Sequence, residues 1–315
     1  MNILGETISL LNLALYNSTG YLFVVAGILI SIRFMGYPDL TVDGSFTFGA
    51  ALYAIAVYHG YPLFLAFLFA ALGGALAGLM TTSINRYLAI GKIMSSVIIM
   101  LGLLTIAPHI TGGSTIGLLN NKHLLAAIQN WDLKLALMFN THGDISLHLG
   151  FVTLFLLIWI ILATAIGFLF STRIGVQMRY LGSANTPGLL SHKQQNRLLL
   201  LGVALGNSMV ALGGAIEAER KGGFSINMGL GIILVGLACL VLGESLVKTR
   251  IRRDEMYVKE YLLAVLLGVF IYSFVLQLLL RLGLTFFDVR LTSVFFLLVL
   301  LAIAARKHPN TGRLF

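Results

Sequence analysis

Long apolar runs alternate with short polar breaks along the chain. An α-helix needs about 20 apolar residues to cross the hydrocarbon core of a bilayer, and most of these runs approach that length. The runs lie at about 8–32, 44–59, 62–80, 94–110, 147–170, 198–216, 231–247, 261–280 and 291–305. The pattern predicts an all-α integral membrane protein with roughly 8–10 transmembrane helices. No interval is long enough for a soluble module, so 1–315 is expected to form a single transmembrane domain.

The first apolar run is interrupted by the polar cluster Asn17-Ser18-Thr19-Gly20. Such a cluster either kinks one long helix or separates a short interfacial helix from a short span. The sequence leaves both alternatives open.

Composition and charge support a membrane protein. The chain is 58% hydrophobic and 10% charged, whereas soluble domains carry about 25% charged residues. Loops 33–43, 81–93, 171–197, 244–260 and 305–315 would share one side and hold 15 of the 21 Lys and Arg residues. An excess of Lys and Arg marks cytoplasmic loops, so this side and the C-terminus are expected to be cytoplasmic. Because these basic residues are spread over five loops, no nucleic-acid partner is expected.

Enzyme, metal and nucleotide signatures are absent from the sequence. Gly91-Lys92 lacks the glycine and the Ser or Thr of a phosphate-binding loop. The seven His residues are scattered, and Cys239 is the single cysteine. We therefore expect no enzyme, no metal site and no cofactor in this chain, so that any ATP and Mg²⁺ would be bound by a partner.

The segment Gly36–Gly49 places two carboxylates and a proline where a span should begin. One interpretation is a broken helix bordering a pathway, since irregular backbone at membrane depth must be buried in protein or line a cavity. The other is an ordinary turn in which Asp43 caps the helix that follows it.

A second polar segment, Glu217–Gly229, runs directly into the next apolar run. Its charges either face solvent or border a pathway. It loosely echoes Asp43-Gly44 on the opposite side of the predicted topology, which would suit an inverted repeat.

A third segment, Ser171–Arg197, lies in a predicted cytoplasmic loop. Polar residues before Pro187 can cap a short helix whose apolar tip is Leu189-Leu190. This helix is either a docking element or an amphipathic connector at the lipid headgroups.

These segments resemble the permeases of the branched-chain amino acid and ribose importer superfamily, and most closely its tryptophan/tyrosine transport system permeases. The matching stretches are Gly36–Gly49, Arg173–Arg179 with Asn185-Thr186-Pro187, Ser225–Gly231, Gly236–Ala238 and Gly243-Glu244. The resemblance covers most of the chain. The family's usual Leu-Gly-Ile-Asn is replaced here by Leu190-Ser191-His192-Lys193.

The resemblance implies the permease subunit of an ATP-binding-cassette importer in a bacterial inner membrane, moving an amino acid or related solute by alternating access. It further implies a homodimer, cytoplasmic ATPase subunits and an extracytoplasmic substrate-binding protein. The expected ATPase-coupling residues are Gly182, Ser183, Ala184, Asn185, Thr186, Pro187, Gly188, Leu189 and Leu190.

Polar groups within or beside spans usually face protein or water. On this ground, the residues expected near the translocation path are Asp43, Asn207, Ser208, Glu217 and Asn227. Each could equally be structural. The alternative function is a secondary transporter or channel without an ATPase. Such a protein would need ionisable residues deep inside spans, whereas here they lie at span ends.

Overall fold

The computed structural model describes residues 3–118, 149–182, 191–250 and 257–283. The expected all-α membrane architecture is confirmed. Six described helices are long and apolar enough to cross a membrane, and a bent pair can supply a seventh span. The shorter helix at 42–58 occupies the place of an eighth expected run. The ninth, 291–305, lies outside the described residues.

Apolar runs become helices because a helix satisfies its own backbone polar groups where water is excluded. The helices are α1 (Ile3–Ile28), α2 (Val42–Tyr58), α3 (Leu63–Tyr87), α4 (Lys92–Thr111), α6 (Leu149–Ser171), α7 (Arg173–Gly182), α8 (His192–Lys221), α9 (Ile232–Arg250) and α10 (Val258–Arg281). Short elements complete the described part: π-helical η1 (Leu29–Phe34), the strands β1 (Thr115–Gly117) and β2 (Gly223–Ser225), and the 3₁₀ turn η3 (Ile226–Gly229).

The polar cluster in the first run leaves α1 continuous. The Ser18 hydroxyl donates to the Leu15 carbonyl at 2.6 Å, and Thr19 donates to the Tyr16 carbonyl at 2.9 Å. These bonds satisfy both hydroxyls inside the helix. Irregularity appears instead at η1, where α1 gives way to a π-helical turn.

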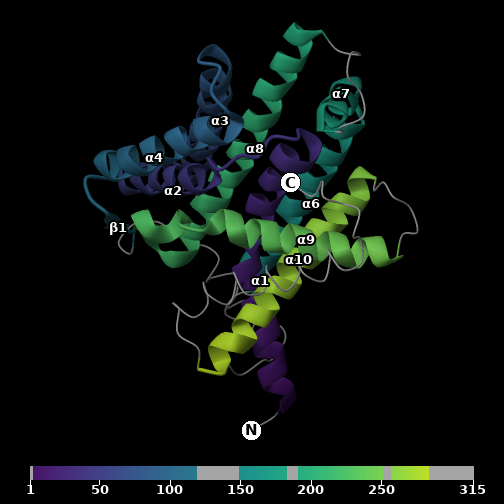
Figure 1. Ribbon diagram of the computed structural model, residues 1–315. Helices are drawn as coiled ribbons and strands as arrows, with labels where there is room; N and C mark the ends of the chain where they lie inside the picture. The colour runs from purple at the N-terminus through teal and green to yellow at the C-terminus, as the bar shows by residue number, and fades with distance from the viewer. Residues whose placement is uncertain (1–2, 119–148, 183–190, 251–256, 284–315) are drawn as a thin grey trace.

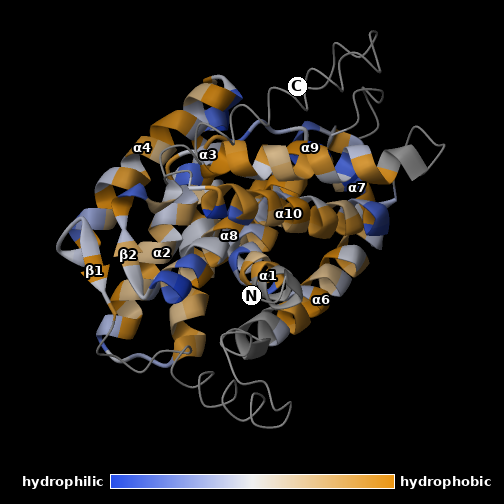
Figure 2. Ribbon diagram, turned by 90° about the horizontal axis from the view of Figure 1, so that it is seen from below, coloured by the Kyte–Doolittle hydropathy of each residue, from blue (hydrophilic) through white to orange (hydrophobic). Residues whose placement is uncertain are grey.

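Helix α8 stands between two groups of helices (Figures 1 and 2). On one side it packs against α2 and α3, with α4 beyond them. On the other side it packs against α1, which contacts α6, α9 and α10. A helix with neighbours on both sides buries most of its length, which agrees with the apolar and small residues that α8 carries.

Small residues allow α8 to approach its neighbours at the level of the backbone. A Cβ atom placed on Gly74 of α3 would lie 2.3 Å from the Asn207 carbonyl oxygen, and one on Gly78 would lie 2.5 Å from that of Val203. On the opposite side, a Cβ on Gly27 would lie 2.3 Å from the Gly206 carbonyl. The glycine pairs Gly74/Gly78 and Gly202/Gly206 therefore lie where neighbouring segments pack closely.

Helices α3 and α4 are largely hydrophobic in Figure 2, and their outer faces carry large exposed apolar side chains. Phe64 is 76% exposed, and Leu76 and Ile93 are each more than half exposed. A soluble protein rarely exposes so continuous an apolar surface. These faces suit contact with lipid or with another membrane chain.

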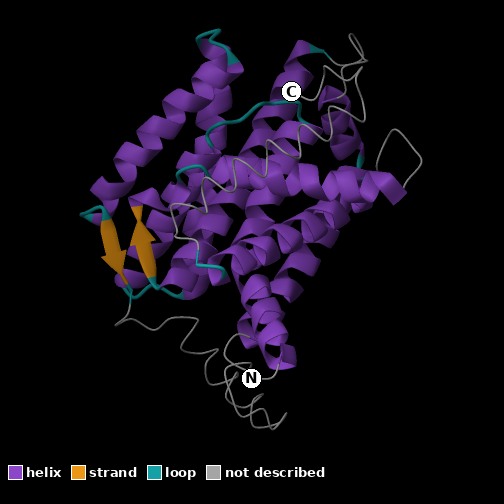
Figure 3. Cartoon of the chain, turned by 60° about the horizontal axis from the view of Figure 1, so that its bottom comes forward, coloured by secondary structure: helices purple, strands orange, loops and turns teal. Residues whose placement is uncertain are grey.

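Several segments that the charge pattern assigns to the same side of the membrane lie together. Strands β1 and β2, from the two loops expected outside, pair antiparallel with Ile116 opposite Phe224 (Figure 3). At the other end of the molecule, Arg33 binds Glu244, and Gly36 packs against Gly182. All four of these residues come from loops, or span ends, expected on the cytoplasmic side.

Candidate functional site

An irregular segment separates η1 from α2 inside the protein. Gly36 has a φ of +59°, and the backbone then runs without helix to Thr41. Tyr37, Asp39 and Thr41 on this segment are at most 1% exposed. Because α2 has 17 residues, it is about 25 Å long and falls short of a hydrocarbon core of about 30 Å. The geometry supports the broken-helix interpretation of Gly36–Gly49.

A buried hydrogen-bond network fastens this segment to the middle of α8. Asn207 donates from Nδ2 to Asp39 Oδ2 at 2.6 Å, and its Oδ1 accepts from the Ser45 hydroxyl at 2.6 Å. The Thr41 amide donates to Asp39 Oδ1 at 2.9 Å, and the Thr41 hydroxyl lies 2.9 Å from that of Thr81 in α3. Asn207 therefore links the segment before α2 to the middle of α8.

Asp43 lies in α2, but its side chain bonds to the start of α9. Its carboxylate oxygens accept from the backbone amides of Gly231 at 2.8 Å and Ile233 at 2.9 Å, where α9 begins. The residue preceding α2 is Thr41, which makes no side-chain capping bond there. The alternative that Asp43 caps its own helix is therefore wrong: the side chain satisfies donors that α9 would otherwise leave unpaired.

The two polar segments that echo each other in the sequence were expected on opposite sides of the membrane, but they meet in the fold. A Cβ on Gly229 would lie 2.1 Å from the Thr47 hydroxyl oxygen and 2.4 Å from the Asp43 carbonyl oxygen. Only glycine permits this approach, so η3 rests directly on the first turns of α2. Helices α2 and α9 thus begin at one junction, as discontinuous helices do around the binding sites of transporters.

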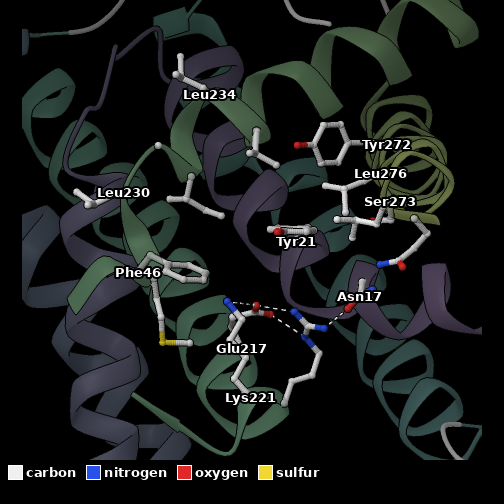
Figure 4. Close-up of a pocket in the computed structure, with 17 residues that line it drawn as sticks. Asn17, Tyr21, Phe46, Glu217, Lys221, Leu230, Leu234, Tyr272, Ser273 and Leu276 are labelled. Atoms are coloured by element: carbon white, nitrogen blue, oxygen red, sulfur yellow. Dashed lines mark hydrogen bonds and ion pairs between the residues drawn. The ribbon is translucent and has the colours of Figure 1, made fainter. Parts of the chain in front are cut away.

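A cavity of about 460 Å³ lies beside this junction, and Figure 4 shows its lining. It is bordered by α1, α2, α8, α10 and the start of α9. Tyr21 and Tyr272 stand edge to face in its wall, with ring centroids 6.3 Å apart. The volume lies in the range of small-molecule sites, whose walls are mostly apolar with a few placed polar groups.

The charged groups of the cavity all come from the C-terminal end of α8. Glu217 accepts from Arg220 at 2.5 Å and lies 3.1 Å from the Lys221 ammonium, while Arg220 also donates to Asn17 (Figure 4). Glu217 is 4% exposed, so the cations offset the cost of burying its charge. Within the described ranges, no group of three His, Cys, Asp or Glu side chains could hold a metal ion.

The predicted path residues have different positions. Glu217 lines the cavity, and Asn207 and Asp43 hold the junction beside it. Ser208 is half-buried and Asn227 exposed, and neither lines the cavity. The sequence missed Asp39 and the cavity residues Asn17, Tyr21, Arg220, Tyr272, Ser273 and Gln277. Arg220 could have been predicted from the sequence, because it follows Glu217 at i+3, a spacing that allows an ion pair on one helix.

At the opposite end of the molecule, α6 and α7 form a bent pair at 83°. The last residue of α7, Gly182, lies against η1: a Cβ there would be 2.8 Å from the Arg33 carbonyl oxygen and 2.7 Å from that of Phe34. Arg33 in turn makes two bonds of 2.7 Å to Glu244 of α9. Of the expected coupling residues, only Gly182 is described, and 183–190 lie outside the described residues.

Comparisons with known proteins find similarity to transport permeases. The family model described as "Branched-chain amino acid transport system / permease component" matches residues 10–304. The chain is similar to the tyrosine transport system permease protein of Clostridioides difficile (strain R20291), with 28% identity over 279 residues, 88% of this chain and 85% of that protein. It is similar also to an uncharacterized protein of Rickettsia prowazekii (strain Madrid E), with 25% identity over 296 residues, 93% of this chain and 97% of that protein. No solved structure matches the chain.

Proposed function

The chain belongs to the family of permease components of branched-chain amino acid transport systems, and on that premise we propose that it is the membrane subunit of an ATP-binding-cassette importer. Its cargo would be an amino acid or a related small solute, as the name of the tyrosine permease relative suggests. The bacterial inner membrane is the expected location.

The observation that carries the proposal is the cavity beside the junction of α2 and α9. It combines aromatic walls with a carboxylate and two cations, which are the complementary groups that a zwitterionic solute requires. Helices α2 and α9 both begin at this point, so the backbone beside the cavity belongs to helix ends that can move relative to each other.

Transport would proceed by alternating access. The cavity lies at the end of α8 expected outside, where a binding protein would deliver solute. At the expected cytoplasmic end, α7 touches η1 through Gly182, and η1 is joined to α9 by Arg33 and Glu244. A displacement of α7 can therefore be transmitted through η1 to α9, whose first turn borders the cavity. ATP and Mg²⁺ would be bound by partner ATPase chains.

A second permease chain would complete the membrane part. The exposed apolar faces of α3 and α4 leave room for such a contact. We propose a second copy of this chain as the partner, with a related permease subunit as the alternative, and the subunit composition of the purified complex separates the two.

The proposal is tested by purifying the tagged chain with its neighbouring gene products and reconstituting it in liposomes. We expect an ATPase chain to co-purify, and labelled L-tyrosine or another amino acid to accumulate only with ATP and the binding protein. Accumulation without ATP would contradict the importer and favour the secondary transporter.

The orientation is tested by labelling introduced cysteines from each side of the membrane. The one native cysteine, Cys239, is buried and gives a low background. We expect Asn185→Cys and Arg252→Cys to react from the cytoplasm, and Lys122→Cys and Lys221→Cys from outside, because Lys and Arg concentrate on the cytoplasmic side. External labelling at position 185 would overturn both the topology and the docking role of its loop.

A further inference from the structure

We propose that the cavity face of α10 is a hydrogen-bonding subsite, in which Ser273 and Gln277 bind a neutral polar group on the side chain of the solute. The inference rests on the proposed transport of an amino acid and adds which end of the solute α10 recognises.

The first observation is the state of the Ser273 hydroxyl. Ser273 is 1% exposed and lines the cavity, yet within the described residues its oxygen has no hydrogen-bond partner. A serine or threonine in a helix usually donates to the carbonyl three or four residues earlier, as Ser96 does to Ile93 at 2.8 Å and Thr105 does to Leu101 at 2.9 Å. Buried hydroxyls are almost always bonded, so one left unbonded in a cavity wall indicates a group that a ligand completes.

Gln277 lies one helical turn after Ser273, on the same face of α10. It also lines the cavity and is 6% exposed. Its amide can both donate and accept, as can the serine hydroxyl. The pair therefore suits a hydroxyl or another neutral group that both donates and accepts hydrogen bonds.

The other residues of this wall indicate what kind of solute side chain would bear the polar group. Leu276 and Leu280 of α10 line the same face, and Tyr272 meets Tyr21 across it (Figure 4). The α10 lining holds no charged residue, whereas Glu217, Arg220 and Lys221 lie on α8. A solute can place its ammonium and carboxylate against α8 and its side chain against α10. The favoured solute class is an amino acid with an apolar or aromatic side chain that ends in a neutral hydrogen-bonding group.

L-tyrosine and L-phenylalanine differ by one such hydroxyl and are suitable probes. Binding of each is measured on the complete complex of permease and ATPase in lipid nanodiscs, without the binding protein, so that the binding protein's own preference does not enter. We expect Ser273→Ala to weaken L-tyrosine binding about three- to tenfold, the usual effect of one lost hydrogen bond, and to change L-phenylalanine binding less than about twofold. Gln277→Leu should act in the same direction.

Ser96→Ala is the matched control, because Ser96 is equally buried but donates within its own helix. Ser273→Thr retains the hydroxyl and should restore preference for L-tyrosine. Equal losses for both ligands in Ser273→Ala would show a structural role and overturn the subsite, as would no loss for either. If the wild-type complex binds neither amino acid, the proposed cargo fails and the subsite fails with it, while co-purification of the ATPase remains a separate result.

Discussion

Replacing Leu189 and Leu190 together by aspartate should abolish both capture of the ATPase and solute-stimulated ATP hydrolysis. An integral protein without a nucleotide site can use ATP only through a contact with the chain that binds it. Central apolar anchors carry most of the binding energy of an interface, and burying two new carboxylates there would be strongly unfavourable. Capture is measured by pull-down and hydrolysis by phosphate release.

The structure of α7, which precedes this loop, supports the same expectation. Residues 183–190, for which an ATPase-coupling role is expected, follow α7 directly in the sequence, and α7 ends at Gly182 in backbone contact with Arg33 and Phe34 of η1. Such contact leaves no flexible side chain to absorb a displacement. A force on the loop would therefore pass to η1 and to the helix that Arg33 holds through Glu244.

Two comparisons make the result interpretable. Charge reversal at Lys193 or Arg197 should have a milder effect, because polar groups at the rim of an interface contribute little. Insertion and monodispersity of the double variant exclude misfolding. If the double variant captures its ATPase and transports normally, the docking role of Leu189 and Leu190 is wrong.

Asp43→Ala should destabilise the protein by about 2–6 kcal/mol, because two amides at the start of α9 lose their acceptor and each such loss costs about 1–3 kcal/mol. The loss of these two hydrogen bonds should also be detectable at the amides themselves. Hydrogen exchange at the Gly231 and Ile233 amides should accelerate, since both donate to Asp43. Mass spectrometry of the exchanged protein in detergent measures it.

Asp43→Asn keeps one acceptor oxygen and should lie between the wild type and the alanine variant. Glu260→Ala is a matched control. Glu260 accepts from the Tyr257 amide at 2.6 Å at the exposed start of α10, where water can replace it, so only about 0.5–2 kcal/mol should be lost. Unchanged exchange at Gly231 and Ile233 in the alanine variant would show that Asp43 does not hold α9.

Most of the helical architecture follows from the sequence because long apolar runs have few alternatives in a membrane. Helices α3, α4 and α10 begin within a few residues of the expected positions. Helix α8 begins at His192 and not near 198, since Ser191 and Gln194 form a reciprocal cap there. Ser-x-x-Gln is a recognisable start signal, but hydropathy alone does not use it.

The candidate site was less predictable because its contacts join distant parts of the chain. Glu217 stands out as a polar residue in an apolar run, whereas Asp39 acquires its role only by meeting Asn207, 168 positions away. Ser273 lies within a long apolar stretch and is indistinguishable in sequence from a serine bonded to its own helix. The bonds from Asp43 to the start of α9 were likewise unpredictable, because they depend on how α9 folds back onto α2.

The junction of α2 and α9 also has an electrical consequence. Asp43 belongs to the first turn of α2 and binds backbone amides at the start of α9, so its carboxylate lies between two helix N-termini. Each N-terminus carries about half a positive elementary charge, and their sum of about one unit is cancelled by this carboxylate. The Asp43 carboxylate therefore offsets the positive potential of both helix ends. Asparagine at position 43 would preserve its shape but leave a net positive potential beside the cavity, which would favour anionic solutes over zwitterions.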